Sequence, residues 1–78
     1  MREFHSPNTL SELNSVLNEA QSRDNSVYFS TSAGIAYVIR IGANDKIYYA
    51  YVGTNENAEI SWDQFQKMKT GFWEDVKQ

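Results

Sequence analysis

The sequence contains no cysteine and only one histidine. Without cysteine, a disulfide framework and a thiolate zinc site are both excluded, and the composition suits the reducing cytoplasm. Long hydrophobic runs are also missing. No segment approaches the ~20 apolar residues that a membrane-spanning helix needs, and no signal-peptide core follows the first residues. We therefore expect a soluble, cytoplasmic protein that has no metal site and no membrane contact.

Catalytic patterns are equally scarce. His5 stands near the N-terminus with no acid or nucleophile arranged around it, and Glu74-Asp75 are adjacent carboxylates that we expect to lie in water. The four glycines are scattered and form no phosphate-binding loop. The acidic stretch over residues 55–59 lacks the spacing of a calcium loop. These absences predict a non-enzymatic protein without a cofactor.

The length and the charge narrow the class of protein further. Seventy-eight residues make one domain over residues 1–78, in which we expect 1–6 to be a flexible tail. The hydrophobic content of 41% is enough for a folded core. A net charge of −3 disfavours direct nucleic-acid binding, which needs a basic surface, and it suits a basic protein partner.

Two amphipathic helices are expected, one near each end of the chain. Thr9 and Glu12 match a capping box, although Ser6 with Pro7 in the first turn is an equally good start. This helix should end at Asp24-Asn25 because asparagine accepts left-handed backbone. Its apolar side carries Leu10, Leu13, Val16, Leu17 and Ala20.

The second helix has a capping box in Ser61 and Gln64. Its apolar stripe is formed by Trp62, Phe65, Phe72, Trp73 and Val76, with Lys69 inside it. We expect one helix with a weak point at Gly71. In the alternative, Gly71 breaks the helix and Phe72-Trp73 redirect the chain.

Between the helices, Val27–Thr31 reads as a first strand and is followed by a hairpin. Two β-branched and aromatic runs, 35–41 and 46–52, flank the turn residues 42–45. A four-residue loop pairs Ile41 with Lys46. A two-residue loop at Asn44-Asp45 shifts the pairs but leaves the same side chains on each face.

The sequence thus predicts an α+β fold: helix, three-stranded antiparallel β-meander, helix, with both helices on one face of the sheet. We expect the helices to cover the face with Ile35, Tyr37, Ile39, Ile41, Tyr48, Ala50 and Val52. The other face would then be free for an interface; it carries Ala36, Val38, Arg40, Ile47, Tyr49 and Tyr51. Alternatively, one helix covers each face and both faces are core.

The order of elements resembles the double-stranded RNA-binding domain, which also runs helix, three strands, helix. That family binds phosphates through lysines at the start of its second helix. Here the same position reads Ser61-Trp62-Asp63-Gln64, so an acid stands where a phosphate would dock. The resemblance therefore implies a topology and not RNA binding.

The element order from Leu10 to Trp73, the acidic balance and the stretch Lys69-Thr70-Gly71-Phe72-Trp73 also resemble small phage-encoded anti-CRISPR proteins. This resemblance implies inhibition by occupancy, in which carboxylates and aromatic rings fill a basic nucleic-acid channel of the target. It also implies that the protein is located in the host cytoplasm.

Together these observations predict a small acidic binding protein, from a phage or mobile element, that inhibits a larger basic protein which handles nucleic acid. The predicted partner-binding residues are Glu56, Glu59, Asp63, Tyr49 and Tyr51. The rival hypothesis is a homodimeric structural or regulatory module that uses the Tyr49 face as its contact. The third hypothesis is a degenerate double-stranded RNA-binding domain.

Overall fold

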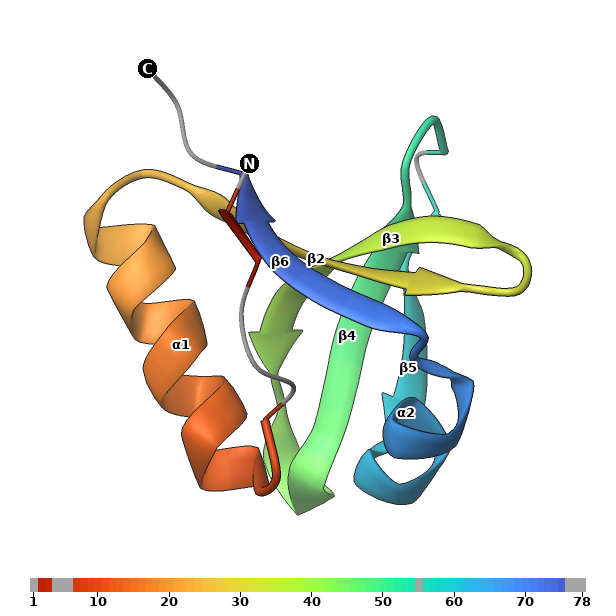
Figure 1. Cartoon of the computed structure of the whole chain (residues 1–78). Helices are drawn as coiled ribbons and strands as arrows, with labels where there is room; N and C mark the ends of the chain where they lie inside the picture. The colour runs from red at the N-terminus through yellow and green to blue at the C-terminus, as the bar shows by residue number, and fades with distance from the viewer. Residues whose placement is uncertain (1, 4–6, 55, 76–78) are drawn as a thin grey trace.

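Among residues 2–3, 7–54 and 56–75, which the computed structural model describes, six strands form one antiparallel sheet and two helices pack against one of its sides (Figure 1). The strands lie side by side in the order β1-β6-β2-β3-β4-β5. Along the chain, the elements are β1 (Arg2–Glu3), α1 (Leu10–Ser22), β2 (Ser26–Thr31), β3 (Gly34–Ile41), a 3-10 turn (Ala43–Asp45), β4 (Lys46–Tyr51), β5 (Ala58–Ser61), α2 (Trp62–Met68) and β6 (Gly71–Asp75).

The α+β class is confirmed, but the predicted three-stranded meander is wrong. Both ends of the chain and the segment before α2 add strands. β5 pairs with β4, β6 pairs with β2, and Arg2–Glu3, which we expected in a flexible tail, pair with β6. Residues 1 and 4–6 of that expected tail, His5 included, lie outside the described residues.

The expected continuation of the second helix through Gly71 is also wrong. α2 ends at Met68, and Lys69 already has extended backbone with ψ of 127°. Beyond Gly71 the side chains alternate, because Phe72 and Glu74 are buried on one side of β6 while Trp73 lies on the other. The period of two is that of a strand, and β2 provides its hydrogen-bonding partner.

The core lies on the side of the sheet that we name the core face. It carries Val27, Phe29, Ala36, Val38, Ile47, Tyr49 and Phe72, and it packs against Leu13, Leu17 and Ala20 of α1 and Phe65 of α2. At its centre the ring of Phe29 lies 5.0 Å from that of Phe65 and 5.6 Å from that of Tyr49, between centroids. The helices therefore cover the face that we expected to be free.

A β-bulge in the central hairpin changes which side chains share a face. Ala36 pairs with Tyr51 and Val38 with Tyr49, but beyond Val38 the register shifts, so that Arg40 pairs with Tyr48. Ile41 then pairs with Ile47, whereas a four-residue loop would have paired it with Lys46. Because the bulge inserts one residue, Ile41 packs against the core, and Arg40 moves to the opposite side with Tyr48.

Local signals place both ends of α1. The Thr9 hydroxyl accepts a hydrogen bond from the Glu12 amide at 3.1 Å, and the Glu12 carboxylate accepts one from the Asn8 amide at 2.8 Å. At the other end the Asn25 amide donates to the Ala20 carbonyl. Asp24, and not Asn25, takes the left-handed conformation with φ of 57°. These contacts form a Schellman motif.

Removing the N-cap of α1 should weaken the fold. We expect Thr9→Ala to lower the free energy of unfolding by about 1 kcal/mol, because the Glu12 amide loses its partner at a helix end. Urea unfolding followed by circular dichroism measures the change. Thr54→Ala, at an exposed turn, is the control for loss of a hydroxyl. An equal cost for both variants would contradict the capping role.

A buried carboxylate joins the end of α1 to β6. Glu74 is 0% exposed and accepts three hydrogen bonds from the Arg23 guanidinium: Nη2 lies 2.8 Å from Oε1 and 3.0 Å from Oε2, and Nε lies 3.2 Å from Oε2. The Asn25 side-chain amide donates to the same carboxylate at 2.7 Å. This bonding to Glu74 raises the pKa of Arg23. The cluster fixes β6 against the helix, which in turn positions Trp73 on the opposite side of the strand.

Candidate functional site

A row of three aromatic side chains crosses the side of the sheet away from the helices, which we name the open face. Tyr28 of β2 pairs with Tyr37 of β3 and with Trp73 of β6. Its ring lies 6.3 Å from the Trp73 ring, nearly parallel at 14°, and 6.1 Å from the Tyr37 ring, edge-on at 64°. All three are half-buried, and neither described helix packs on them.

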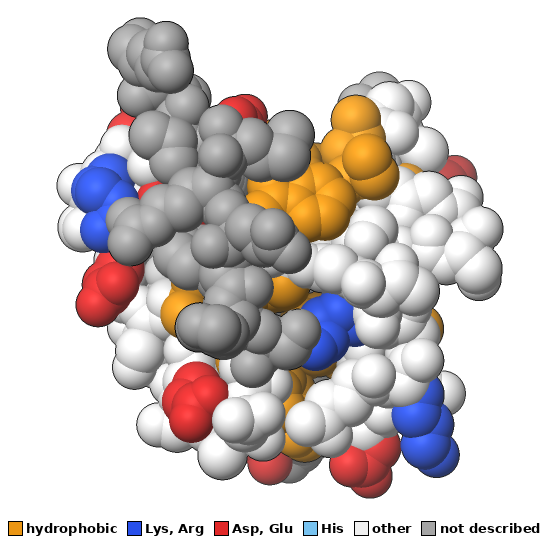
Figure 2. Space-filling model, in the orientation of Figure 1, with side chains coloured by type: hydrophobic (Ala, Val, Ile, Leu, Met, Phe, Trp, Pro, Cys, Tyr) orange, Lys and Arg blue, Asp and Glu red, His pale blue; other side chains and the backbone are white. Residues whose placement is uncertain are grey.

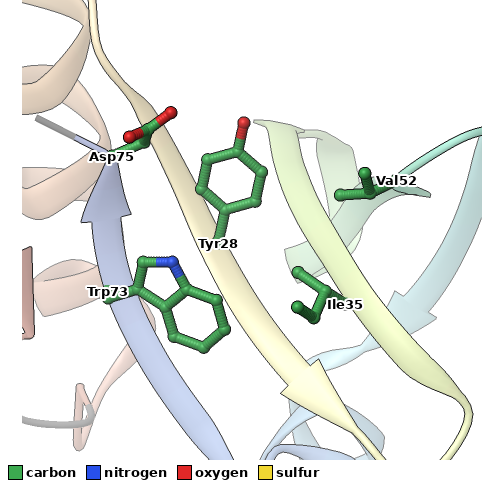
Figure 3. Close-up of a pocket in the computed structure, with 5 residues that line it drawn as sticks. All are labelled: Tyr28, Ile35, Val52, Trp73 and Asp75. Atoms are coloured by element: carbon green, nitrogen blue, oxygen red, sulfur yellow. The ribbon is translucent and has the colours of Figure 1, made fainter. Parts of the chain in front are cut away.

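One end of this row forms the wall of a shallow hollow (Figure 3). The hollow has a volume of about 190 Å³ and is lined by Tyr28, Ile35, Val52, Trp73 and Asp75. Ile35 and Val52 are the exposed large hydrophobic residues of the described chain, at 46% and 58% exposure. The Val52 amide donates to the Ile35 carbonyl at 2.8 Å, which holds these two side chains together at the rim.

The hollow is apolar along its walls and acidic at one end. Asp75 is the last residue of β6 and is exposed, and Figure 3 shows its carboxylate at the same end of the hollow as the Tyr28 hydroxyl. Within the described residues no cation forms an ion pair with Asp75. Figure 2 shows hydrophobic side chains gathered at the surface near the upper end of β6. Such a site can hold an apolar group that ends in a positive charge.

The other end of the open face holds a cation over an aromatic ring and one ion pair. The Arg40 guanidinium carbon lies 4.0 Å from the centre of the Tyr48 ring. Beside it, Lys46 Nζ lies 3.4 Å from Glu59 Oε1 across the β4–β5 pair. The charges of Lys46 and Glu59 cancel, and Arg40 leaves a positive charge at this end of the open face, whereas Asp75 places a negative charge at the hollow.

Glu59 makes the free energy of unfolding depend on pH. A hydrogen bond from Tyr48, followed by the contact with Lys46, holds the pKa of Glu59 below its ordinary value of 4.5. A depressed folded-state pKa means that the carboxylate stabilises the fold above the unfolded value, and that this contribution is lost as the pH falls through the folded value. We expect Glu59→Gln to be less stable than the wild type at neutral pH and equally stable in acid. Urea unfolding over a pH series measures this, and a gap that widens in acid would contradict it.

Two of the predicted site residues, Tyr49 and Tyr51, lie on the core face. Tyr49 is only 7% exposed, and burial, followed by the neighbouring Tyr51, raises its pKa. Tyr51 is half-buried, with its ring 5.6 Å from that of Tyr49, and packs against the same core. The prediction that these tyrosines are free for a partner is therefore wrong, because the helices cover their side of the sheet.

The three predicted acids are exposed, and two of them, Glu59 and Asp63, lie on opposite sides of the sheet. Glu56 lies in the loop between β4 and β5, and Glu59 is on the open face opposite Tyr48. Asp63 lies in the first turn of α2, which packs on the core face. The structure thus separates Asp63 from Glu59 and places neither beside an exposed tyrosine of the predicted set.

The residues that the sequence analysis missed are Trp73, Tyr28 and Asp75. Residues 71–75 were assigned to a helix, in which Trp73 would have been buried. The signal that identifies Trp73 is the alternation after Gly71, with buried Phe72 and Glu74 flanking Trp73. The same alternation puts Asp75 on the side of Trp73.

Within the described residues, no group of three or more histidine, cysteine, aspartate or glutamate side chains could hold a metal ion. Neither described helix is long and apolar enough to cross a bilayer. Comparisons of the chain with protein-family models, with curated proteins and with solved structures each found no match.

Proposed function

We propose that this chain is a non-enzymatic binding protein whose contact surface is the open face of the sheet. The observation that carries the proposal is the row Trp73, Tyr28 and Tyr37 with the hollow beside it, an aromatic and apolar surface that neither described helix covers. Contiguous apolar surface of this kind typically marks an interaction site.

The physical properties of the open face suit protein recognition. Tyrosine and tryptophan bury a large area and lose little conformational entropy, and they dominate the binding energy of many interfaces. Here they project from paired strands, so their backbone positions are fixed before binding. The net charge of −3 and Asp75, which has no ion pair among the described residues, favour a larger, basic protein as the partner.

We extend the proposal to inhibition. A basic partner surface that binds nucleic acid offers the cations that the carboxylates need, and an acidic protein seated there would block it. A nucleic-acid-handling host protein, such as a CRISPR effector, is the proposed target. The action would be occupancy of its nucleic-acid-binding surface. The support is the acidity of the chain together with Asp75 on the open face.

The test is capture with matched variants. Wild-type protein, Tyr37→Glu on the open face and Lys67→Glu on the exposed side of α2 are immobilised and exposed to a bacterial lysate. We expect a basic protein to be retained by the wild type and by Lys67→Glu, to be lost with Tyr37→Glu, and to elute with salt. Equal retention by the wild type and both variants would contradict the open face as the contact surface.

The same variants separate the rival functions. Light scattering that shows a dimer of the wild type and a monomer of Tyr37→Glu would assign the open face to a second copy of the chain. Retention of duplex RNA at moderate salt would favour the nucleic-acid-binding alternative. For the inhibitor, the captured protein should lose its own nucleic-acid binding when wild-type protein is added, and keep it when Tyr37→Glu is added.

A further inference from the structure

We propose that the hollow lined by Tyr28, Ile35, Val52, Trp73 and Asp75 receives an arginine side chain of the protein partner. The inference rests on the proposed function and specifies its chemistry. A site for a whole drug-sized ligand or cofactor encloses about 300–1,000 Å³. The hollow, at about 190 Å³, is smaller than that and is suited to one side chain.

The aromatic wall favours a flat cation. The rings of Tyr28 and Trp73 are nearly parallel, at 14°, and so present a common surface on which a planar group can stack. A guanidinium is planar and weakly hydrated, and it stacks on aromatic faces more readily than an ammonium does. The same face already holds one such contact, because the Arg40 guanidinium lies 4.0 Å from the centre of the Tyr48 ring.

The negative charge of Asp75 at the end of the hollow also favours a guanidinium. Asp75 is exposed and forms no ion pair within the described residues, and its carboxylate lies at the Tyr28 hydroxyl end of the hollow in Figure 3. A carboxylate accepts two parallel hydrogen bonds from a guanidinium, which an ammonium cannot supply in that geometry. Ile35 and Val52 at the rim are placed to cover the methylene groups of the arginine. A phosphate or a carboxylate ligand would be repelled.

The experiment uses small probes on the whole chain. Nitrogen-15-labelled protein is titrated with N-acetyl-arginine methylamide, with its lysine analogue and with its citrulline analogue, which keeps the shape and lacks the charge. The indole N–H signal of Trp73 reports binding, and that of Trp62 on α2 is the internal control. We expect the arginine probe to bind at least about tenfold more tightly than citrulline, because hydrogen bonds to a charged group are the stronger ones. The lysine probe should fall between them.

Two variants complete the test. Asp75→Asn should weaken binding of the arginine probe about tenfold and remove its preference over citrulline. Asp63→Asn, which changes another exposed carboxylate, on α2, should leave the affinity for the arginine probe and its preference over citrulline unchanged. Unchanged amide spectra away from β6 show that each variant is folded.

Three results would overturn the inference: no shift of the Trp73 signal up to the solubility limit of the arginine probe, equal binding of arginine and citrulline, or wild-type binding by Asp75→Asn. Each is distinct from failure of the proposed function. Capture that depends on Tyr37 but not on Asp75 would keep the open face as a contact surface and remove the arginine. Capture that is independent of Tyr37 would remove the proposed function, whatever the probes do.

Discussion

Replacing Tyr49 with glutamate is expected to unfold the protein in the absence of denaturant. Tyr49 is 7% exposed and packs edge-on against Phe29 and Tyr51, with ring centroids 5.6 Å away in each case. Deleting a buried aromatic ring costs about 3–5 kcal/mol. The new carboxylate would be buried without a described cation beside it, which adds several kcal/mol. The sum is comparable to the whole stability of a domain of this length, about 4–12 kcal/mol.

The matched control is Tyr37→Glu, which places the same charge on the open face. Tyr37 is half-buried and loses chiefly its edge contact with Tyr28, so we expect the variant to stay folded and to lose about 1 kcal/mol. Circular dichroism and urea unfolding compare the two. A folded Tyr49→Glu variant, as stable as Tyr37→Glu, would refute the assignment of the core face.

Removing the guanidinium that pairs with Glu74 should produce the next largest loss. We expect Arg23→Ala to lower the free energy of unfolding by about 3 kcal/mol, because it leaves a fully buried carboxylate without its cation. The value is at the low end for a broken buried pair, since Arg23 is itself 43% exposed and Asn25 continues to donate to Glu74. Urea unfolding measures the change.

Lys46→Ala provides the comparison for an exposed ion pair. Lys46 and Glu59 are about half exposed and lie 3.4 Å apart, so we expect a cost below about 1 kcal/mol. The double variant Arg23→Ala with Glu74→Gln should be more stable than Arg23→Ala alone. The reason is that the buried charge of Glu74 is then gone. A cost for Arg23→Ala no greater than for Lys46→Ala would show that the buried cluster does not hold β6 in place.

The features that the sequence predicted well are those fixed by residues close together in the chain. Thr9 caps α1, and Ser61 with Gln64 forms the capping box of α2, with both reciprocal hydrogen bonds present. Each depends on amides within three residues of the cap, so the pattern alone contains the information. Helix starts and the polar turn of the hairpin follow from the same kind of local chemistry.

The strands at the edges depend on distant partners and were missed. Phe72 and Trp73 fit a helical stripe with Phe65 as well as they fit an alternating strand, and only pairing with β2 decides between the two. Ile60, directly before the capping residue Ser61, belongs to β5 and pairs with Ile47 of β4. Ser61 ends that strand and caps α2 at once, a double role that one local pattern does not reveal.

The choice of face was wrong for a related reason. Both faces of the hairpin are apolar, so periodicity alone could not tell which one the helices cover. β2 and β6 settle it, because Val27, Phe29 and Phe72 are buried on the side of Tyr49. The acids Glu56 and Glu59 are exposed, but the aromatic residues of the candidate site had to be found from the register.

Solvent accessibility of the aromatic rings tests the central claim most directly. A soluble gadolinium chelate broadens the nuclear magnetic resonance signals of ring protons that water reaches, without any substitution in the protein. We expect strong broadening for Trp73, Tyr28 and Tyr37 on the open face, and little for Tyr49 and Phe29 under the helices. Broadening of Tyr49 as strong as that of Tyr37 would contradict the assignment of the two faces and, with it, the proposed binding surface.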